Sequence, residues 1–504
     1  MTVIPRVYVD WSDAGTFTGT GENVTARVFA RPGIISSRGR DQIRALTPPA
    51  AGTFQAELDN VSRDYSPENS TSPLDGLLYP GHKVRATVFI GTEVLYDSDE
   101  LYDSDALYDG APAYHVATNL LDDIPQNPAI GVQTVEIPSI GTLSRLVGKR
   151  ISTPLYQSIP ISTAMGYVLD AVGWPATDRV ISTSTTTLDW WWLDDADAWD
   201  AIQALFFSEG PGAALYEDSL GRFVFEDRTY RILETRCTTN QMTLAATDTI
   251  PPITAMTYQS GIKDIVNYCS VSYSRRTAQS LAAVWSLGTT VTLAAAESRS
   301  FVARSSTGDP FTGAVTPVVT TDYTVSVGSL ASVTLSRTSG AQVTVTITAG
   351  GSGATVTALQ LRAQLVTVSA SGSIANTVDA STSISRYGLR PFNYTTWPEI
   401  SINVLQDLVN TVVTTYSVPQ PMILVTAIGA DDASTLALLR REVSDRISVA
   451  DPTSGFASDV FIEQITVRVT DAGKVAVTFG CTKTTATGYA VWDTAEWDDG
   501  RWGY

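Results

Sequence analysis

Short stretches of alternating apolar and polar residues recur along the chain and limit it to a mainly β fold. Residues 6–11, 24–28 and 53–58 alternate in this way, and 83–90 follows a Tyr-Pro-Gly-His turn. Alternation with period two sends successive side chains to opposite faces of a strand. The chain is also rich in Thr, Ser and Val, and β-branched side chains fit a pleated surface. For 504 residues we therefore expect a multi-domain protein, mainly β with a few amphipathic helices.

Four segments carry apolar residues at helical spacing instead. The first covers 161–172, with Ser162 as its N-cap, and the second covers 197–209. The third covers 397–418 and has proline at the favoured first helical position. The fourth covers 431–447.

Composition changes along the chain and divides it further. Residues 285–370 contain three acids and four arginines among alternating Thr, Val and Ser, which predicts an inserted antiparallel β-sandwich. Residues 215–225 predict a hairpin. The expected parts are a first β domain of barrel or sandwich type at 1–150, a mixed α+β domain at 151–235, a second β domain with two helices at 236–284 and 371–488, the insertion at 285–370, and an aromatic, acidic tail at 489–504.

The net charge of −19 is concentrated in two segments that lack Lys and Arg. Residues 86–144 hold ten acids and 180–221 hold eight, whereas 1–85 sums to zero. Such segments cannot neutralise phosphates, so we expect no specific binding of nucleic acid. The two interpretations are a solvated acidic surface and a face that repels nucleic acid inside a channel. The candidate channel acids are Asp97, Asp99, Asp103, Asp105, Asp109, Asp122, Asp123, Asp194, Asp195 and Asp197.

A threefold Leu-Tyr-Asp hexapeptide repeat covers 95–112, inside the first acidic segment. Its even period places the leucines on one face of an extended chain and the tyrosines on the other. Aspartates spaced by two could ligate Ca²⁺, but the glycine-containing loop with a closing glutamate is absent. A protruding acidic hairpin or loop is the favoured interpretation.

The sequence contains few residues arranged for catalysis. His82 and His115 are the two histidines, and both are interpreted as structural. Metal-ligand motifs, a phosphate-binding loop and a nucleophile elbow are absent from the sequence. Asp189 and Asp200 lie beside tryptophans that could stack a sugar, but such runs belong more often to a core. We therefore expect no catalytic, cofactor-binding or metal site and no enzymatic activity.

The three cysteines, Cys237, Cys269 and Cys481, are widely spaced and odd in number. This spacing predicts reduced, buried thiols and assembly in a reducing cytoplasm. The N-terminus lacks a stretch typical of a signal peptide, and no apolar run reaches about 18 residues, so we expect no membrane span.

The tail at 489–504 has no periodic core pattern. An aromatic segment of this kind rarely stays free in water, so we expect it to dock on a neighbouring protein. The candidate docking residues are Trp492, Trp497, Trp502 and Tyr504.

Several short segments, taken in order, resemble the tail-hub type of minor tail protein from phages of actinobacteria. They cover most of 1–285 and 384–480, and their order is more specific than any one segment. The segments are 51–53, 59–60, 65–69, 72–74, 79–85, 122–125, 141–146, 168–175, the run 208–228, and the C-terminal Trp-Asp-x-x-x-Trp-Asp that ends at Asp498.

The resemblance implies a homotrimer in which two barrel-like domains per chain form a pseudo-sixfold ring. Residues 1–150 would supply one barrel, and 236–284 with 371–488 the other. The ring would continue the tail tube at the distal tip of the virion, with an acidic, DNA-passable channel. Its expected partners are the distal tail protein ring, the tape-measure protein and tail-tip or fibre proteins. The family has no catalytic motif to transfer.

Two other functions compete with the hub. One is a peripheral receptor- or glycan-binding tail adhesin whose binding module is 285–370, and the other is peptidoglycan hydrolysis at the tail tip. The Leu-Tyr-Asp repeat and the insertion at 285–370 depart from the hub pattern, so contact with the host surface stays open. A hub is expected on the tail axis in three copies, and an adhesin at the periphery.

Overall fold

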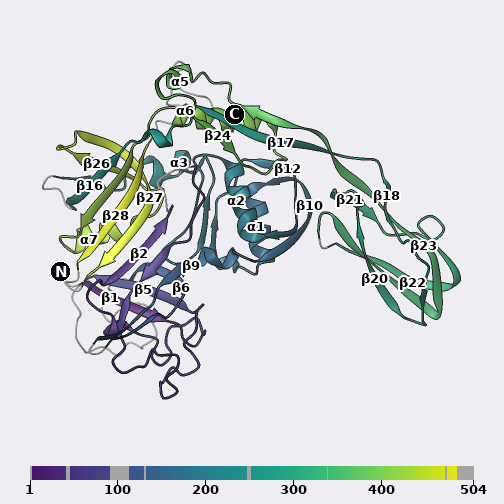
Figure 1. Ribbon diagram of the computed structural model, residues 1–504, viewed down its shortest axis with the longest axis horizontal. Helices are drawn as coiled ribbons and strands as arrows, with labels where there is room; N and C mark the ends of the chain where they lie inside the picture. The colour runs from purple at the N-terminus through teal and green to yellow at the C-terminus, as the bar shows by residue number, and fades with distance from the viewer. Residues whose placement is uncertain are drawn as a thin grey trace.

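The computed structural model describes residues 3–40, 46–90, 113–129, 132–246, 251–337, 339–470 and 474–484. The fold is mainly β with a few helices, which confirms the expected class. A body of sheets and helices carries a long β arm that projects from one side (Figure 1).

The main sheet of the body combines strands from both ends of the chain. Its order is β1-β5-β6-β9-β3-β2-β27-β28-β25-β16, and β26 and β15 extend it beside β27. The bounds are β1 (Val3–Val9), β2 (Ile34–Gly39), β3 (Thr53–Gln55), β5 (Lys83–Ile90), β6 (Ala113–Leu121), β9 (Ser139–Gly141), β15 (Thr243–Ala245), β16 (Ile253–Gln259), β25 (Met422–Ile428), β26 (Arg446–Asp451), β27 (Phe456–Val469) and β28 (Val475–Lys483).

One strand pair connects the two halves of this sheet. β2 pairs with β3 on one side and, antiparallel, with β27 on the other, Ile34 opposite Val469. The described strands therefore follow one open path from β1 to β16, and they do not close into the two barrels expected for 1–150 and 236–284 with 371–488. The backbone of β2 bonds to both halves, so its hydrogen bonds join them instead of closing each half on itself.

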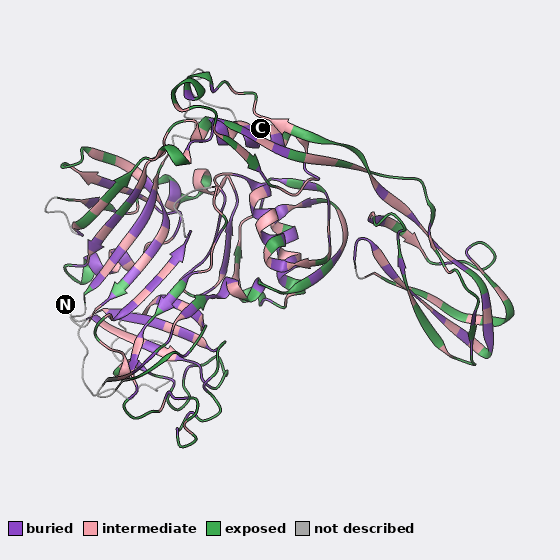
Figure 2. Cartoon of the chain, viewed as in Figure 1, coloured by how far each residue is buried: buried purple, intermediate pink, exposed green. Residues whose placement is uncertain are grey.

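Alternation of side chains builds the core of the main sheet. In β28, Val475, Val477, Phe479 and Cys481 are buried, Ala476 and Thr478 between them are half-buried, and so is Thr482 after them. Figure 2 shows the same alternation along several strands of this sheet. Burial of one face accounts for the period-two pattern in the sequence.

The middle of the chain contains two helices and two small sheets. Helix α1 (Ile161–Ala171) and helix α2 (Ala198–Glu209) confirm the predicted segments. One sheet pairs β10 (Arg150–Pro160) with β12 (Thr187–Asp197). The other has the order β11 (Arg179–Ile181), β14 (Phe223–Glu226) and β13 (Ala214–Glu217). In it, β13 and β14 form the predicted hairpin. The remaining sheet of the body joins β4 (Glu57–Asp59), β8 (Val132–Glu136) and β7 (Gln126–Ala129).

The ends of three helices differ from the prediction. Pro160 occupies the N-cap position of α1, so Ser162 lies inside the first turn and its Oγ accepts from the Ser184 amide at 3.1 Å. Helix α6 (Ile402–Tyr416) begins after Pro398, whose carbonyl accepts from the Ser274 amide. Backbone pairing with a neighbouring segment therefore keeps the predicted first turn of α6 extended.

Helix α7 (Asp432–Leu439) is shorter than the predicted 431–447. Asp431 caps its start, and its side chain accepts from the Ser434 amide at 2.7 Å. Ser444 has a φ of 71°, a left-handed conformation that a helix cannot contain. Ile447 lies beyond it and is buried in β26. The apolar residues that fitted one helical period therefore belong partly to α7 and partly to the strand that follows.

The arm is built on β23 (Gln342–Ala375), a 34-residue strand. The strands of the 285–370 region pair with it antiparallel, as predicted. Its partners are β17 (Tyr268–Ala278), β18 (Ala282–Ser286), β19 (Val291–Leu293), β20 (Ser298–Arg304), β21 (Phe311–Val315) and β22 (Tyr323–Arg337). A separate hydrophobic cluster of residues between Val284 and Leu365 fills the arm. The expected domain limits themselves stay a prediction.

Short elements complete the body. They are α3 (Tyr230–Leu233), α4 (Thr235–Thr238), α5 (Ser381–Tyr387), β24 (Pro391–Tyr394), and the 3-10 turns at Thr25–Arg27, Thr142–Leu146, Ala176–Asp178 and Ile262–Asp264. Helix α3 contacts β27 through the Arg231–Glu463 ion pair, and α4 contacts β14 through the Arg236–Glu226 ion pair.

Candidate functional site

The β13–β14 hairpin is buried on both faces and joins two hydrophobic cores. Leu215, Phe223 and Phe225 pack in the core around α1 and α2. Tyr216 and Val224, which point the other way, pack in the core of the main sheet. Every residue of both strands is buried, including Glu217 and Glu226. Neither strand therefore alternates between a buried and an exposed face. The hairpin and the charged side chains around it are called the hairpin joint below: Glu217, Glu226, Arg231, Arg236, Arg40, Asp445 and Glu463.

Glu217, at the end of β13, connects the hairpin to the N-terminal half of the main sheet. Its carboxylate accepts hydrogen bonds from the Leu143 amide at 3.0 Å, from the Thr142 hydroxyl at 3.0 Å and from the Gly52 amide. Burial raises the pKa of Glu217, and these hydrogen bonds oppose that rise. A Cβ atom at Gly141 would overlap this carboxylate, so the glycine leaves the space that Glu217 fills.

Glu463, on β27, is paired with two arginines inside the protein. Arg231 of α3 donates two hydrogen bonds to it at 2.6 and 2.9 Å, and Arg40 Nε lies 3.6 Å from Glu463 Oε2. The Thr482 hydroxyl donates to it at 2.8 Å. Burial alone would raise the pKa of Glu463, but the charges of Arg231 and Arg40 outweigh it and lower the pKa to about 2. The carboxylate therefore stays ionised.

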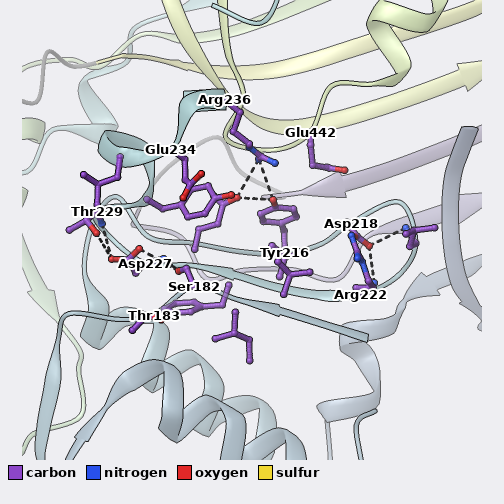
Figure 3. A pocket seen from close by; sticks show the side chains of 18 of the residues that line it. Ser182, Thr183, Tyr216, Asp218, Arg222, Asp227, Thr229, Glu234, Arg236 and Glu442 are labelled. Atoms are coloured by element: carbon purple, nitrogen blue, oxygen red, sulfur yellow. Dashed lines mark hydrogen bonds and ion pairs between the residues drawn. The ribbon is translucent and has the colours of Figure 1, made fainter. Parts of the chain in front are cut away.

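Arg236 of α4 forms a second ionic cluster beside the first. Its guanidinium lies 3.3 Å from Glu226 Oε1 and 3.2 Å from Asp445 Oδ1, and it also donates to the Val443 carbonyl. The Tyr216 hydroxyl donates to the same Glu226 oxygen at 2.9 Å. Figure 3 shows the side chains of Arg236 and Tyr216 pointing toward each other across the joint.

A cavity of about 610 Å³ opens beside this cluster (Figure 3). Its polar lining includes Asp218 and Arg222, paired at 2.6 Å, and Asp227, which accepts from the Thr229 hydroxyl at 2.6 Å. The apolar part of its lining is exposed at Val180, Leu220 and Leu233, with Leu233 73% exposed.

The side chains at this cavity are suited to fixing the structure and not to catalysis. Burial raises the pKa of the nearby Cys237 to about 11, so the thiol stays protonated near neutral pH. Burial, with the charge of Glu226, also raises the pKa of Tyr216 well above its usual value. In the described part of the chain, no three His, Cys, Asp or Glu side chains come together where they could hold a metal ion. The carboxylates at the cavity are mostly bound to arginines or hydroxyls, an arrangement that fixes side chains in place.

The candidate channel acids of the second charged segment each bind another group of the chain. Asp194 pairs with Arg304 of the arm at 3.0 Å, and Asp195 pairs with Arg150 at 3.1 Å. Asp197 caps α2, and its carboxylate accepts from the Trp199 amide at 2.9 Å.

Of the candidate channel acids in the first charged segment, two are described. Asp122 and Asp123 are exposed beyond β6 and make no ion pair with a described residue. Asp97, Asp99, Asp103, Asp105 and Asp109, with the whole Leu-Tyr-Asp repeat, lie outside the described residues, as do Trp492, Trp497, Trp502 and Tyr504.

The Trp-rich run near Asp189 belongs to a core. Trp191 is fully buried beside α1 and α2, and Trp192 packs against Trp397 with ring centroids 5.5 Å apart. Asp189 and Asp200 themselves are exposed. The interpretation as core residues is confirmed for Trp191, whereas Trp192 is half-buried outside the core clusters of the described residues.

His82 and the three cysteines are buried in the structure. His82 is buried and lies 2.8 Å from Asp13 Oδ1 through Nδ1 and 2.7 Å from the Leu77 carbonyl through Nε2, a structural role. Cys237, Cys269 and Cys481 are free and buried, as expected. None of the described helices has the length and apolar character needed to cross a membrane.

Sequence reasoning missed the hairpin joint. Arg231 and Glu463 are 232 positions apart, and Gly52 and Glu217 are 165 apart. A local pattern cannot show pairs at such separations. The available signal was acidic residues in a run that otherwise reads as fully apolar strands, because a buried acid needs a partner.

Comparison with known proteins gives distant likenesses only. No protein-family model matches the sequence, and no curated protein matches it. Among solved structures, a tail protein from Neisseria meningitidis MC58 is similar at 10% identity and a TM-score of 0.48, over 96% of this chain and 97% of that one. A 43 kDa tail protein of prophage MuSo2 from Shewanella oneidensis is similar at 10% identity and a TM-score of 0.47, over 95% and 98%. Prophage tail protein gp18 from Listeria monocytogenes EGD-e follows at 8% and 0.39, over 95% of each chain. All three TM-scores are below 0.5, so these likenesses are distant.

Proposed function

We propose that this protein is a structural hub at the distal tip of a phage tail. The observation that carries the proposal is that three segments of the hub resemblance meet at one side chain. Segment 51–53 supplies the Gly52 amide, segment 141–146 supplies Thr142 and Leu143, and the run 208–228 supplies Glu217. Three of the segments that carry the resemblance thus meet at the hairpin that joins the two cores. Such a rigid framework suits a ring that bears load.

The proposed hub is a homotrimer and acts without catalysis. Strand β16 supports assembly with other chains, because it is the last strand of the main sheet and pairs on one side with β25 among the described strands. An edge strand offers unpaired backbone groups to a neighbouring chain. The distal tail protein ring, the tape-measure protein and tail-tip or fibre proteins are the proposed partners. The protein would assemble in the host cytoplasm and reside in the virion.

We further propose that the hub surrounds a channel that DNA passes. Asp122 and Asp123 are the described acids best suited to its wall, because they are exposed and make no ion pair with a described residue. Asp194, Asp195 and Asp197 are less suited, since each is bound to a neighbour. Carboxylates facing the channel would repel phosphates over about 8 Å at physiological salt, so DNA would slide without binding.

Electron cryomicroscopy of intact tails tests these proposals together. The expected result is three copies of the chain on the tail axis, with acidic residues at the channel wall. One copy or six copies per tail would contradict the trimer. A neutral or basic wall next to 86–144 and 180–221 would contradict the channel proposal and leave the trimer intact.

One observation favours the alternative of a peripheral adhesin. The arm projects from the body, and one face of it carries a ladder of hydroxyls, with Ser298 bonded to Thr348 and Ser300 to Thr346, both at 2.8 Å. Uncharged hydroxyls can hydrogen-bond a glycan. An adhesin would lie away from the tail axis, and a protein lacking the arm would fail to bind host cells while still assembling into tails.

A further inference from the structure

A second cavity, of about 530 Å³, gathers cations that pair with no carboxylate of the described residues. It lies where the loop after β1 and the start of β5 meet the segments that follow the Thr142–Leu146 turn and α1. Lys83, Arg145 and Lys149 line it. In the described part of the chain, none of the three makes an ion pair, and the Arg145 guanidinium lies over the Trp174 ring, 5.4 Å from its centroid.

The two acids of this cavity are bound to other groups of the chain. Asp10 is buried and accepts from the Ala14 amide at 3.0 Å and the Gly15 amide at 2.8 Å. Asp13 accepts from the Tyr79 hydroxyl at 2.7 Å and lies 2.8 Å from the His82 ring nitrogen. Both acids keep their charge, but three cations against two carboxylates leave the lining with an excess of one positive charge, in a chain whose net charge is −19.

We propose that this cavity binds the acidic, aromatic segment 491–504 of a second copy of the chain. That segment holds four acids and one arginine: Asp493, Glu496, Asp498, Asp499 and Arg501. It also holds Trp492, Trp497 and Trp502, whose rings can stack on the exposed Arg145 guanidinium, while the Trp174 ring beneath that guanidinium is buried. The inference rests on the proposed function, because it requires chains that assemble with one another.

The register of the main sheet favours a second copy over the same chain. Lys83 is opposite Leu120, and the row of partners then runs through Ile140, Thr53, Ser37 and Thr466 to Thr478 of β28. Six strand spacings of about 4.8 Å separate Lys83 from Thr478, about 29 Å along the sheet. The chain's own segment could cross this distance only by running back in an extended form, whereas a segment from a neighbour need not.

The ligand is tested with a labelled peptide. The probe is a fluorescent peptide of residues 489–504, titrated into full-length protein whose own acids are amidated (D493N, E496Q, D498N, D499N). Lys149→Glu should weaken binding at least about fivefold, since it replaces an attraction by a repulsion. Lys263→Glu reverses the charge of another exposed lysine outside this cavity and should leave binding within about twofold.

Two results of the titration would overturn the ligand assignment. One is binding that Lys149→Glu leaves unchanged. The other is an oligonucleotide of equal charge that binds as tightly as the peptide and with the same dependence on Lys149, which would make the cavity a general anion site. Replacing the three tryptophans of the peptide by alanine should also weaken binding, whereas a purely ionic site would tolerate it.

Cross-linking separates the second-copy assignment from the trimer itself. Full-length protein with Lys149→Cys and Asp498→Cys should, on oxidation, form disulfide-linked chains that neither single variant forms. A link confined to single chains overturns the second-copy assignment. A trimer by light scattering that forms no such link overturns the inference and leaves the proposed function standing. Protein that stays monomeric at all concentrations overturns the proposed trimer instead.

Discussion

Removing the charge of Glu463 should cost much of the stability that the hairpin joint provides. In the variant Glu463→Gln the side chain keeps its shape, but Arg231 and Arg40 lose their buried counter-charge. The pKa of Glu463 is lowered from 4.5 to about 2. At about 1.4 kcal/mol per pKa unit, the ionised carboxylate stabilises the fold by about 3 kcal/mol at pH 7. A loss of this size is typical when one member of a buried ion pair is removed.

The lowered pKa of Glu463 also determines how the loss of stability in Glu463→Gln depends on pH. A carboxyl group with a lowered pKa contributes its full stability above its ordinary pKa of 4.5, and the contribution is lost as the pH falls toward about 2. The difference between wild type and Glu463→Gln should therefore shrink to about 1.4 kcal/mol at pH 3. Urea unfolding at both pH values, compared at equal m-values, measures it.

The control for this experiment is an exposed ion pair. Arg150 and Asp195 lie 3.1 Å apart with side chains 58% and 74% exposed. Solvent screens such a pair, so Asp195→Asn should leave the unfolding midpoint nearly unchanged. The reasoning is refuted if both variants lose equal stability, or if the loss in Glu463→Gln is the same at pH 7 and pH 3.

Three further predictions concern the packing of Gly141, the reactivity of the cysteines and catalysis. Gly141→Ala should lower stability by about 1–3 kcal/mol, because its Cβ would overlap the Glu217 carboxylate, and Glu217→Ala should restore part of the loss in a thermal unfolding series; an unchanged melting temperature for Gly141→Ala contradicts this. Burial raises the pKa of Cys237 to about 11 and of Cys269 to about 12, so a thiol reagent at pH 8 should label the native protein hardly at all and all three cysteines in urea. Purified protein should release neither sugar nor peptide from cell-wall material; release that Asp189→Ala or Asp200→Ala abolishes would make the protein an enzyme.

Local sequence signals predicted local structure. Helices α1 and α2 and the β13–β14 hairpin appear where periodicity and turn residues place them, since their hydrogen bonds join residues close in sequence. The prediction for α7 ran too far because Ile447 continued the apolar period, although Ser444 breaks the helix with a left-handed backbone.

Pairing between distant segments was beyond such signals. The β2–β27 pair joins Ile34 to Val469, and nothing near either residue specifies the other. The candidate site was missed for the same reason, because Glu217 and Glu463 acquire partners only when the whole chain has folded. The acidic segments were visible in the sequence, but the engagement of Asp194 by Arg304 depends on how the arm meets the body.

The burial of the β13–β14 hairpin on both faces has a consequence for recombination between related genes. Because Tyr216 faces one core and Phe223 the other, a replacement for 151–235 must match two sets of neighbours at once. The arm is different, since its hydrophobic cluster is drawn from within 284–365. We therefore expect gene exchange to replace the arm more readily than part of the body, provided that the Arg304–Asp194 ion pair between arm and body is kept.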